Sequence, residues 1–169
     1  MTDGAGHVLR SELCLGDEAA VREIVASTGF FSPAEIDIAV ELVAERRQKG
    51  DASGYWFQFL EIDGRTVGYT CYGPIPATRS SYDLYWIAVL ASARRRGLGR
   101  VLLAASERDI ARLGGTRIYV DTSSRPDYAP TRGFYAGNAY AVAAELPEFY
   151  APGDGKVIFC KVLGGAHGR

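Results

Sequence analysis

The sequence contains no run of about 20 consecutive apolar residues, so it offers no candidate for a membrane-spanning helix. Its first residues also lack the basic start and apolar core of a secretion signal. We therefore expect a cytoplasmic protein with no membrane partner. Charge of one sign is not in excess either, because 19 lysines and arginines against 20 aspartates and glutamates give a net charge of −1. This balance argues against a chain built as a whole to bind nucleic acid.

Cysteine and histidine are scarce, with three and two residues respectively. Cys14, Cys71 and Cys160 are far apart and follow no paired or metal-binding spacing. We expect neither a disulfide framework nor a metal site, and we interpret all three cysteines as small core residues. His7 and His167 lie near the two ends of the sequence, where we expect solvated side chains. A histidine-based mechanism is therefore not expected.

The remaining composition is that of a globular protein, with 47% apolar and 23% charged residues among 169. This length predicts one domain over residues 1–169, with a core from about residue 8 to 163. Glycine is abundant, at 20 residues. Such an excess marks turns and places where the backbone comes close to another group.

Hydrophobic periodicity and turn signals predict an alternation of strands and helices within one α/β layer structure. Ser32, Pro33 and Glu35 form a helix-opening capping box, Asp17 is a second candidate helix cap, and Asp63-Gly64 is a hairpin turn. The expected strands cover residues 7–13, 55–62, 66–72, 82–90, 116–122, 139–146 and 156–163, and the expected helices cover 18–26, 33–49, 98–113 and 131–137.

The loop between the buried strand 82–90 and the helix from Leu98 is the most informative segment. Gly97 and Gly99 lie at the start of this helix, where free N–H groups and the helix dipole favour an anion. Four arginines surround the glycines: Arg94, Arg95, Arg96 and Arg100. A phosphate-binding P-loop is excluded because no lysine followed by serine or threonine is present, and a dinucleotide fingerprint would need glycine where Leu102 stands. A nucleic-acid patch lacks interleaved aromatic residues, and a solvated arginine run stays open as an alternative.

The motif Arg94-x-x-Gly97-x-Gly99, between a strand ending at Val89 and the helical pair Leu102-Leu103, resembles the acetyl-coenzyme A signature of the GNAT superfamily of N-acetyltransferases. The order of elements from about residue 8 to 163 is similar to that family as well. The resemblance implies a mixed, mostly antiparallel twisted sheet of about seven strands flanked by about four helices. It also implies acetyl-coenzyme A as co-substrate, with no metal.

In the family, the backbone at the end of the fourth strand binds the pantetheine arm, and the following loop binds the pyrophosphate. The resemblance assigns coenzyme binding to Ala88, Val89, Arg94, Arg95, Arg96, Gly97, Leu98, Gly99, Arg100 and Tyr128. Tyr128 stands where the family often has asparagine. Arg125 or Arg132 is an alternative partner for the 3′-phosphate of the coenzyme.

Two further residues are the candidates for catalysis. The pair Phe134-Tyr135 resembles a family motif whose tyrosine protonates the departing thiolate, so Tyr135 is the expected general acid. An amine acceptor must lose a proton before it attacks, and Asp83, in an otherwise apolar strand, is the expected base, directly or through a water. The alternative for Asp83 is a cap of the turn at residues 80–81. Cys71 has no histidine near it in the sequence, so we expect no acyl-enzyme.

The expected function is therefore transfer of an acetyl group to a primary amine of a small molecule or an amino-acid-like acceptor. The candidate acceptor residues are Phe30, Phe31, Tyr72, Tyr82, Tyr85 and Glu148, some of which have a core role as their alternative. A non-catalytic module that binds or senses acyl-coenzyme A is the second hypothesis, and nucleic-acid binding through the arginines ranks last. The oligomeric state stays open, a homodimer included.

Overall fold

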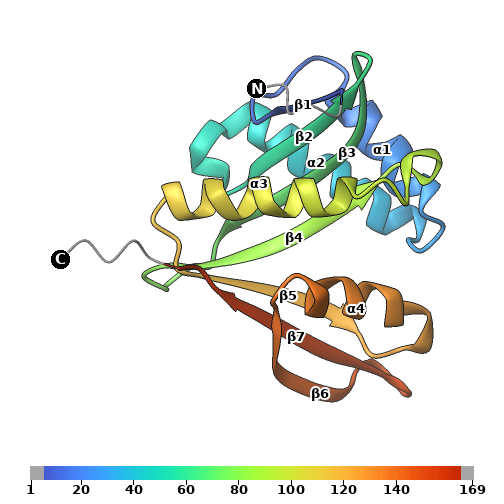
Figure 1. Cartoon of the computed structure of the whole chain (residues 1–169), viewed down its shortest axis with the longest axis vertical. Helices are drawn as coiled ribbons and strands as arrows, with labels where there is room; N and C mark the ends of the chain where they lie inside the picture. The colour runs from blue at the N-terminus through green and yellow to red at the C-terminus, as the bar shows by residue number, and fades with distance from the viewer. Residues whose placement is uncertain (1–5, 165–169) are drawn as a thin grey trace. The chain divides into compact units, whose positions relative to one another are not determined.

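The computed structural model describes residues 6–164, which contain four α-helices and seven β-strands (Figure 1). The elements follow one another as β1 (His7–Arg10), α1 (Asp17–Ser27), α2 (Pro33–Lys49), β2 (Trp56–Ile62), β3 (Arg65–Pro74), β4 (Ser81–Val89), α3 (Leu98–Arg112), β5 (Arg117–Ser123), α4 (Ala129–Gly137), β6 (Ala141–Ala151) and β7 (Asp154–Val162). The strand order is β1-β2-β3-β4-β5-β7-β6. Strands β4 and β5 are parallel, and the pairs β1–β2, β2–β3, β5–β7 and β7–β6 are antiparallel. The expected fold class is confirmed.

The chain divides into two compact units. The first unit runs to Gly73 and includes Trp86–Asp109, and the second unit contains Pro74–Tyr85 and the chain from Ile110 onward. Strand β4 and helix α3 contribute residues to both units.

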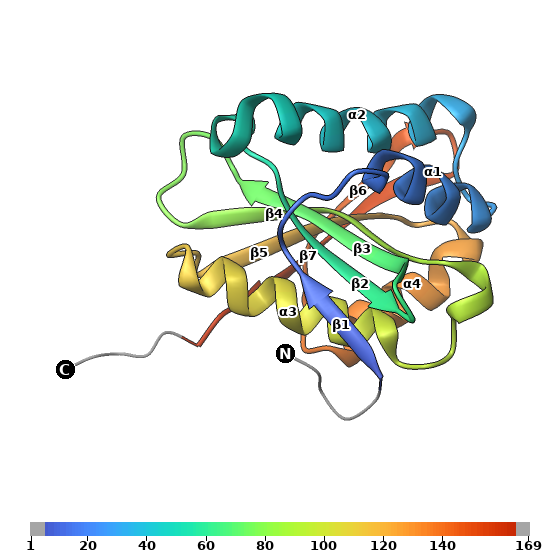
Figure 2. The same ribbon diagram turned by 90° about the horizontal axis from the view of Figure 1, so that it is seen from above.

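In the first unit, α1 and α2 lie on one side of strands β1 to β3, and α3 lies on the other (Figure 2). The core consists of apolar residues from all of these elements, such as Ile24 of α1, Val43 of α2, Phe59 of β2 and Leu102 of α3. A Cβ added at Gly68 would lie 2.9 Å from Leu102 Cδ1. A larger residue at that position would therefore force the Leu102 side chain to shift.

The local signals of the first unit are partly confirmed. Ser32 caps α2 and forms the expected capping box with Glu35. The hairpin turn at residues 63–64 is confirmed too, because Asp63 and Gly64 both have positive φ angles of 51° and 76° and Ile62 pairs with Arg65. Strand β1 ends at Arg10 rather than at residue 13, because the chain beyond it turns toward α1.

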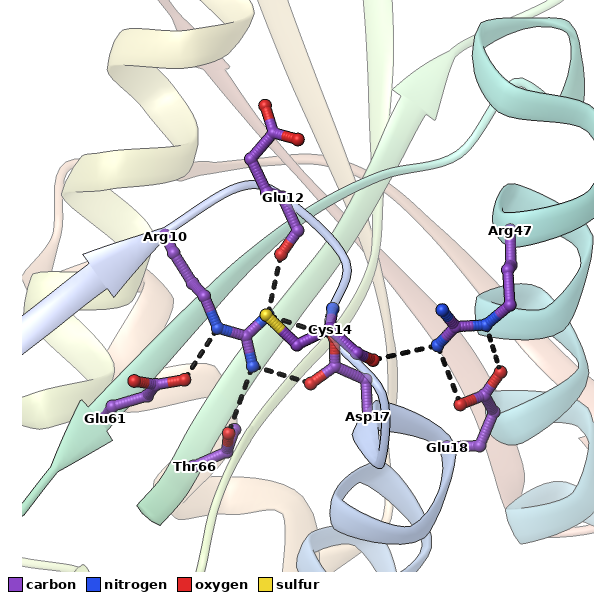
Figure 3. A network of polar contacts seen from close by, with 8 residues as sticks. All are labelled: Arg10, Glu12, Cys14, Asp17, Glu18, Arg47, Glu61 and Thr66. Atoms are coloured by element: carbon purple, nitrogen blue, oxygen red, sulfur yellow. Dashed lines mark hydrogen bonds and ion pairs between the residues drawn. The ribbon is translucent and has the colours of Figure 1, made fainter. Parts of the chain in front are cut away.

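The expectation that Asp17 caps α1 is wrong. The N-cap is Gly16, with φ 93°, and Asp17 is the first helical residue. Its carboxylate is 2% exposed and accepts hydrogen bonds from two nitrogens of Arg10 and from the backbone N–H of Cys14 (Figure 3). Arg10 in turn donates to Glu61 over 2.6 Å. This ion pair with β1 determines the role of Asp17.

Two other expectations near this network are also wrong. The side chain of His7 is buried in β1 rather than solvated, because His7 pairs with Ile62 of β2. Cys14 is exposed, whereas Cys71 is buried as expected and Cys160 is half-buried. All three cysteines are free thiols. His167 lies outside the described residues.

In the second unit, β4 pairs with β5 in parallel, so that Tyr82 lies beside Ile118 and Asp83 beside Tyr119. Strands β5, β7 and β6 continue in antiparallel fashion. The short helix α4 packs its buried Tyr135 against Phe159 of β7, with ring centroids 5.8 Å apart. The last hairpin spans residues 141–162 rather than the expected 139–163, because Ala139 adopts a positive φ of 67° that closes α4 before β6 begins.

Candidate active site

The anion-binding loop expected from the sequence lies in the first unit. Strand β4 ends at Val89, a single 3-10 turn covers Ala91–Ala93, and α3 begins at Leu98. Between them the backbone is extended at Arg94 and left-handed at Arg95 and Gly97, with φ angles of 62° and 73°. A Cβ at Gly97 would meet no atom within 4 Å, so the peptide there is open to a ligand. The sequence prediction of a strand, a loop and a helix start is confirmed.

The backbone of this loop supplies hydrogen-bond donors. The N–H groups of Arg100 and Val101 both donate to the carbonyl of Gly97, which makes the first turn of α3. The N–H groups that precede them at the start of a helix have no partner within it, and the positive end of the helix dipole lies there. The side chains of Arg94, Arg95, Arg96 and Arg100 are all exposed. The loop therefore combines directed N–H donors with local positive charge, which suits a polyphosphate.

Two backbone contacts fix the start of the loop. The N–H of Leu90 donates to the carbonyl of Val67 over 2.7 Å, and the N–H of Ala91 donates to Ser27 Oγ over 3.0 Å. Ser27, in the last turn of α1, therefore positions the loop. Ser27 carries no local sequence signal of this role, because its partner lies 64 positions away. Ala88 and Val89, the expected pantetheine-binding residues, are the last two residues of β4, just before these two hydrogen bonds. Ala88 is buried and Val89 is partly buried.

Tyr72, expected near the acceptor, belongs to the core. Its hydroxyl donates to Asp109 Oδ2 over 2.5 Å and accepts from Gln58 over 3.2 Å, and its side chain is fully buried. Burial, followed by the hydrogen bond to Asp109, raises the pKa of the Tyr72 hydroxyl. Thr70 and Ser106 make a second such link 2.7 Å long. These polar contacts hold α3 against β2 and β3.

The two phenylalanines between α1 and α2 have different environments. Phe31 packs against the core, with its ring 4.9 Å from that of Trp86 in an edge-to-face arrangement. Phe30 is 44% exposed. Phe31 thus takes the core role that the sequence left open, and Phe30 is the one of the pair that is available to a ligand.

Asp83 lies in the second unit, on a half-buried position of β4. Burial raises the pKa of its carboxyl, the negative charge of Asp121 raises it further, and the positive charge of Lys156 opposes the shift. The turn at residues 80–81 is closed by other groups, since the carbonyl of Ser80 accepts from the N–H of Thr116 and its hydroxyl pairs with that of Thr116. The alternative role of Asp83 as a cap of this turn is therefore not required.

The neighbours of Asp83 along β4 point to opposite faces of the strand. Tyr85, two residues on, is 39% exposed on the face of Asp83. Tyr82 is buried on the other face, and a Cβ at Gly115 would lie 2.7 Å from its ring. Of the expected acceptor residues on β4, only Tyr85 is accessible, and Tyr82 is a core residue.

Tyr135 is buried on α4, where its ring packs against Phe134, Tyr140 and Phe159. Burial raises the pKa of its hydroxyl, which therefore keeps its proton at neutral pH. A tyrosine in this state can donate a proton but does not carry a negative charge.

The connection from β5 to α4 is fixed by arginines. Arg132 Nη1 donates to the carbonyls of Ser123 and Arg125, over 2.7 and 2.9 Å. The Arg125 guanidinium lies 5.3 Å from the ring centroid of Tyr128 and also pairs with Asp127. The contacts of Arg132 are thus with the backbone of this connection. Tyr128 is the N-cap residue of α4, and its ring contacts Arg125.

The second unit also contains an open cavity of about 740 Å³ between α4 and the β6–β7 hairpin. Arg132, Ala136, Val142, Glu148 and Phe159 are among its lining residues. Glu148 is exposed there, on backbone with a positive φ of 54°.

Among residues 6–164 no three His, Cys, Asp or Glu side chains gather closely enough to hold a metal ion. Over the same residues, every helix is too short or too polar to cross a membrane.

Comparison with known proteins agrees with this arrangement. The model of the acetyltransferase (GNAT) family matches residues 20–138. A solved structure from Desulfovibrio desulfuricans, of a protein assigned to the GNAT family of acetyltransferases, is 44% identical, has a TM-score of 0.92, and the match covers 94% of this chain and 99% of that one. No curated protein matches the chain.

More distant structures share the fold. The ribosomal-protein-S18-alanine N-acetyltransferase from Escherichia coli is 18% identical, with a TM-score of 0.75 and coverage of 96% of this chain and 97% of that one. The PaiA N-acetyltransferase from Thermoplasma acidophilum, solved in complex with coenzyme A, is 15% identical, with a TM-score of 0.71 and coverage of 92% and 98%.

The family match and the 44% identical structure define the class of this protein as an acyltransferase. The chain belongs to the GNAT family, and it is an N-acetyltransferase. The resemblance of the Arg94 to Gly99 motif predicted this family correctly.

Proposed function

We propose that this enzyme transfers the acetyl group of acetyl-coenzyme A directly to a primary amine of a small molecule or an amino-acid-like acceptor. The observation that carries the proposal is the loop between β4 and α3, where left-handed backbone at Gly97 opens the start of a helix beside four exposed arginines. This loop would bind the pyrophosphate of the coenzyme through N–H groups and guanidinium forks. The N–H of Val89, at the end of β4, would donate to the thioester oxygen as negative charge develops there.

The acceptor requires a base. An alkyl amine with a pKa of about 10 is mostly an ammonium ion at neutral pH and cannot attack until it loses a proton. In the proposed mechanism the Asp83 carboxylate takes this proton, directly or through one water. Its half-buried position and its raised pKa support the assignment, because a base works best when its pKa is near the operating pH.

The transfer then needs an acid. The neutral amine attacks the carbonyl carbon, a C–N bond forms, and the C–S bond breaks. The departing thiolate takes a proton from Tyr135, the new amide nitrogen loses its second proton to water, and solvent returns a proton to Tyr135. Asp83 releases its own proton to solvent. The products are the N-acetylated amine, the coenzyme thiol and one net proton.

Calorimetric titration with acetyl-coenzyme A tests donor binding. We expect Arg94, Arg95 and Arg96 changed together to Ala to raise Kd at least about tenfold, because several charge-assisted contacts are lost. Arg79→Ala, which removes an exposed arginine of the second unit, is the matched control and leaves Kd within about twofold. Absence of heat with the wild-type protein at millimolar donor overturns the proposal.

A thiol-release assay over a panel of primary amines tests turnover. Release with at least one amine supports the enzyme, and tight donor binding without release across the panel supports the sensing module instead. If the arginine loop binds nucleic acid, association depends steeply on salt and the triple variant abolishes it.

A further inference from the structure

Lys156 occupies a central place on one face of the second unit. Its Nζ donates to Asp121 Oδ2 over 2.7 Å. The same ammonium lies 4.2 Å from the ring centroid of Phe149 and 5.9 Å from that of Tyr150, at the end of β6. One cation therefore contacts a carboxylate on β5 and two half-exposed aromatic rings on the neighbouring hairpin arm.

The strand register places this group on the face of Asp83. Asp83 lies beside Tyr119, and Asp121 follows Tyr119 on the same face of β5. Ser123, two residues further, pairs with Lys156 across β5 and β7. Paired residues share a face of a sheet, so Asp83, Asp121 and Lys156 all lie on one side of it.

Other titratable groups of the second unit lie on or near the face of the sheet that carries Asp83. By strand alternation, Tyr85 of β4, Arg117 and Tyr119 of β5, and Cys160 of β7 lie on it, and Tyr150 and Asp154 adjoin it from the β6–β7 hairpin. Asp154 is held by Ser123 Oγ and lies 3.9 Å from Arg125. Lys156 is the cation of this face that hydrogen-bonds to Asp121 and whose positive charge also acts on Asp83.

The charges of Asp83, Asp121 and Lys156 shift one another's pKa values. Although partial burial disfavours the ammonium, the hydrogen bond to Asp121 and the attraction to Asp121 and Asp83 raise the pKa of Lys156, so it stays charged. Burial and the Asp121 charge raise the pKa of Asp83, and Lys156 limits that rise.

We propose that Lys156 is a positioning residue for acetyl transfer, because its ammonium group holds Asp121, Phe149 and Tyr150 in place and offsets the charge of Asp121 beside Asp83. The inference rests on the proposed function, in which Asp83 is the base. With both carboxylates ionised, Asp83, Asp121 and Lys156 together carry a net charge of −1, which favours a cationic acceptor. Phe149 and Tyr150 add aromatic surface next to that charge.

The direct test is a titration of the Asp83 carboxyl by carbon-13 NMR, with the signal assigned by its loss in Asp83→Asn. Lys156→Met keeps the aliphatic stem and removes the charge, so we expect the titration midpoint of Asp83 to move to higher pH by about one unit. Asp121→Asn removes the neighbouring negative charge, so the midpoint moves to lower pH. The double variant lies between the two single variants, and Lys156→Arg stays close to wild type.

Lys161→Met is the matched control on the same strand. Lys161 Nζ donates to the carbonyl of Asn138 and lies 5.5 Å from the ring of Tyr140, in a different environment. We expect Lys161→Met to leave the titration midpoint of Asp83 unchanged. An Asp83 midpoint that is the same in Lys156→Met and wild type overturns the proposed charge effect, provided that circular dichroism shows a folded variant. If Lys156→Met does not fold, an unchanged midpoint in Asp121→Asn has the same meaning.

Kinetics with an accepted amine give the second readout. In Lys156→Met we expect kcat/KM at pH 6 to fall about tenfold, the acid limb of the profile to move to higher pH, and Lys156→Arg to recover most of the activity. If Lys156→Met leaves the acid limb in place while Asp83→Asn removes it, the role of Lys156 is wrong and the proposed function stands. If Asp83→Asn itself leaves the acid limb unchanged, the assignment of the base is wrong, and this role of Lys156 falls with it.

Discussion

The hydroxyl of Ser27 accepts a hydrogen bond from the backbone N–H of Ala91, 64 residues later, over 3.0 Å. The contact ties the last turn of α1 to the loop that follows β4, and Ser27 also donates to the carbonyl of Ile24. The loop is therefore fixed by a residue of a helix that contributes no part of the loop itself. Preorganisation of this kind lowers the entropic cost of binding a ligand.

Ser27→Ala should weaken coenzyme binding without abolishing it. Loss of this hydrogen bond removes about 1 kcal/mol from the free energy of unfolding and frees the N–H of Ala91. We expect Kd for acetyl-coenzyme A to rise about threefold to tenfold, as measured by calorimetry. Ser11→Ala, at an exposed serine, is the control. Equal Kd values for the two variants would show that Ser27 does not position the loop.

Asp17→Asn should destabilise the fold far more than a typical surface change. Asp17 is 2% exposed and Arg10 is 16% exposed, and the substitution leaves the Arg10 charge only partly compensated, by Glu61 (Figure 3). We expect a loss of about 3 kcal/mol in urea unfolding. Asp37→Asn breaks an exposed pair with Arg22 and should cost less than about 1 kcal/mol. Similar losses for both would contradict the argument.

The behaviour of Asp17 shows which features the sequence predicts and which it does not. The capping box at Ser32 and Glu35 involves neighbours within one helical turn, so the local pattern is sufficient. Asp17 has the same local signature of a cap, but its carboxylate binds Arg10, which the chain brings to it from another element. Whether the Asp17 carboxylate caps α1 or binds Arg10 depends on how β1 and α1 pack, and the local sequence does not encode that packing.

The candidate site likewise has one part that the sequence predicts and one part that it does not. The loop from Arg94 to Gly99 is a continuous segment, and its conformation follows from a strand, two glycines and a helix start. The group of Asp121 and Lys156 is not continuous, since 35 residues separate its members. Only the register of β5 against β7 brings them together, and no spacing in the sequence encodes that register directly.

Tyr135→Phe should slow thiol release and leave donor binding nearly intact. Burial raises the pKa of Tyr135, so its proton is available across the neutral range and the tyrosine itself adds no basic limb to the rate profile there. Removal of a general acid typically costs about a hundredfold or more. Tyr140→Phe, which changes a ring 5.6 Å away, is the control for packing. If both variants are equally active, Tyr135 is not the acid.

Asp83→Asn should reduce kcat/KM more at pH 7 than at about pH 9.5. At pH 7 the acceptor is almost wholly an ammonium ion and depends on a base, whereas at high pH more of it arrives neutral. We expect the ratio of wild-type to variant kcat/KM to fall steadily as the pH is raised from 7 to about 9.5, near the pKa of the acceptor. A ratio that does not change with pH would indicate a structural role for Asp83.

The same substitution should make the protein more stable at neutral pH. The pKa of Asp83 is raised in the folded state by burial first and by Asp121 second, so the folded protein binds this proton more tightly than the unfolded chain does. The free energy of unfolding of the wild type therefore falls as the pH rises from the ordinary carboxyl pKa, about 4, to the raised value, and stays lowered above it. Asp83→Asn removes this penalty, so its advantage in urea unfolding is largest at pH 7 and disappears below about pH 4. Asp127→Asn, at an exposed aspartate paired with Arg125, is the control and should show no such gain. If Asp83→Asn is less stable than wild type at pH 7, the ionised Asp83 stabilises the folded state instead of destabilising it.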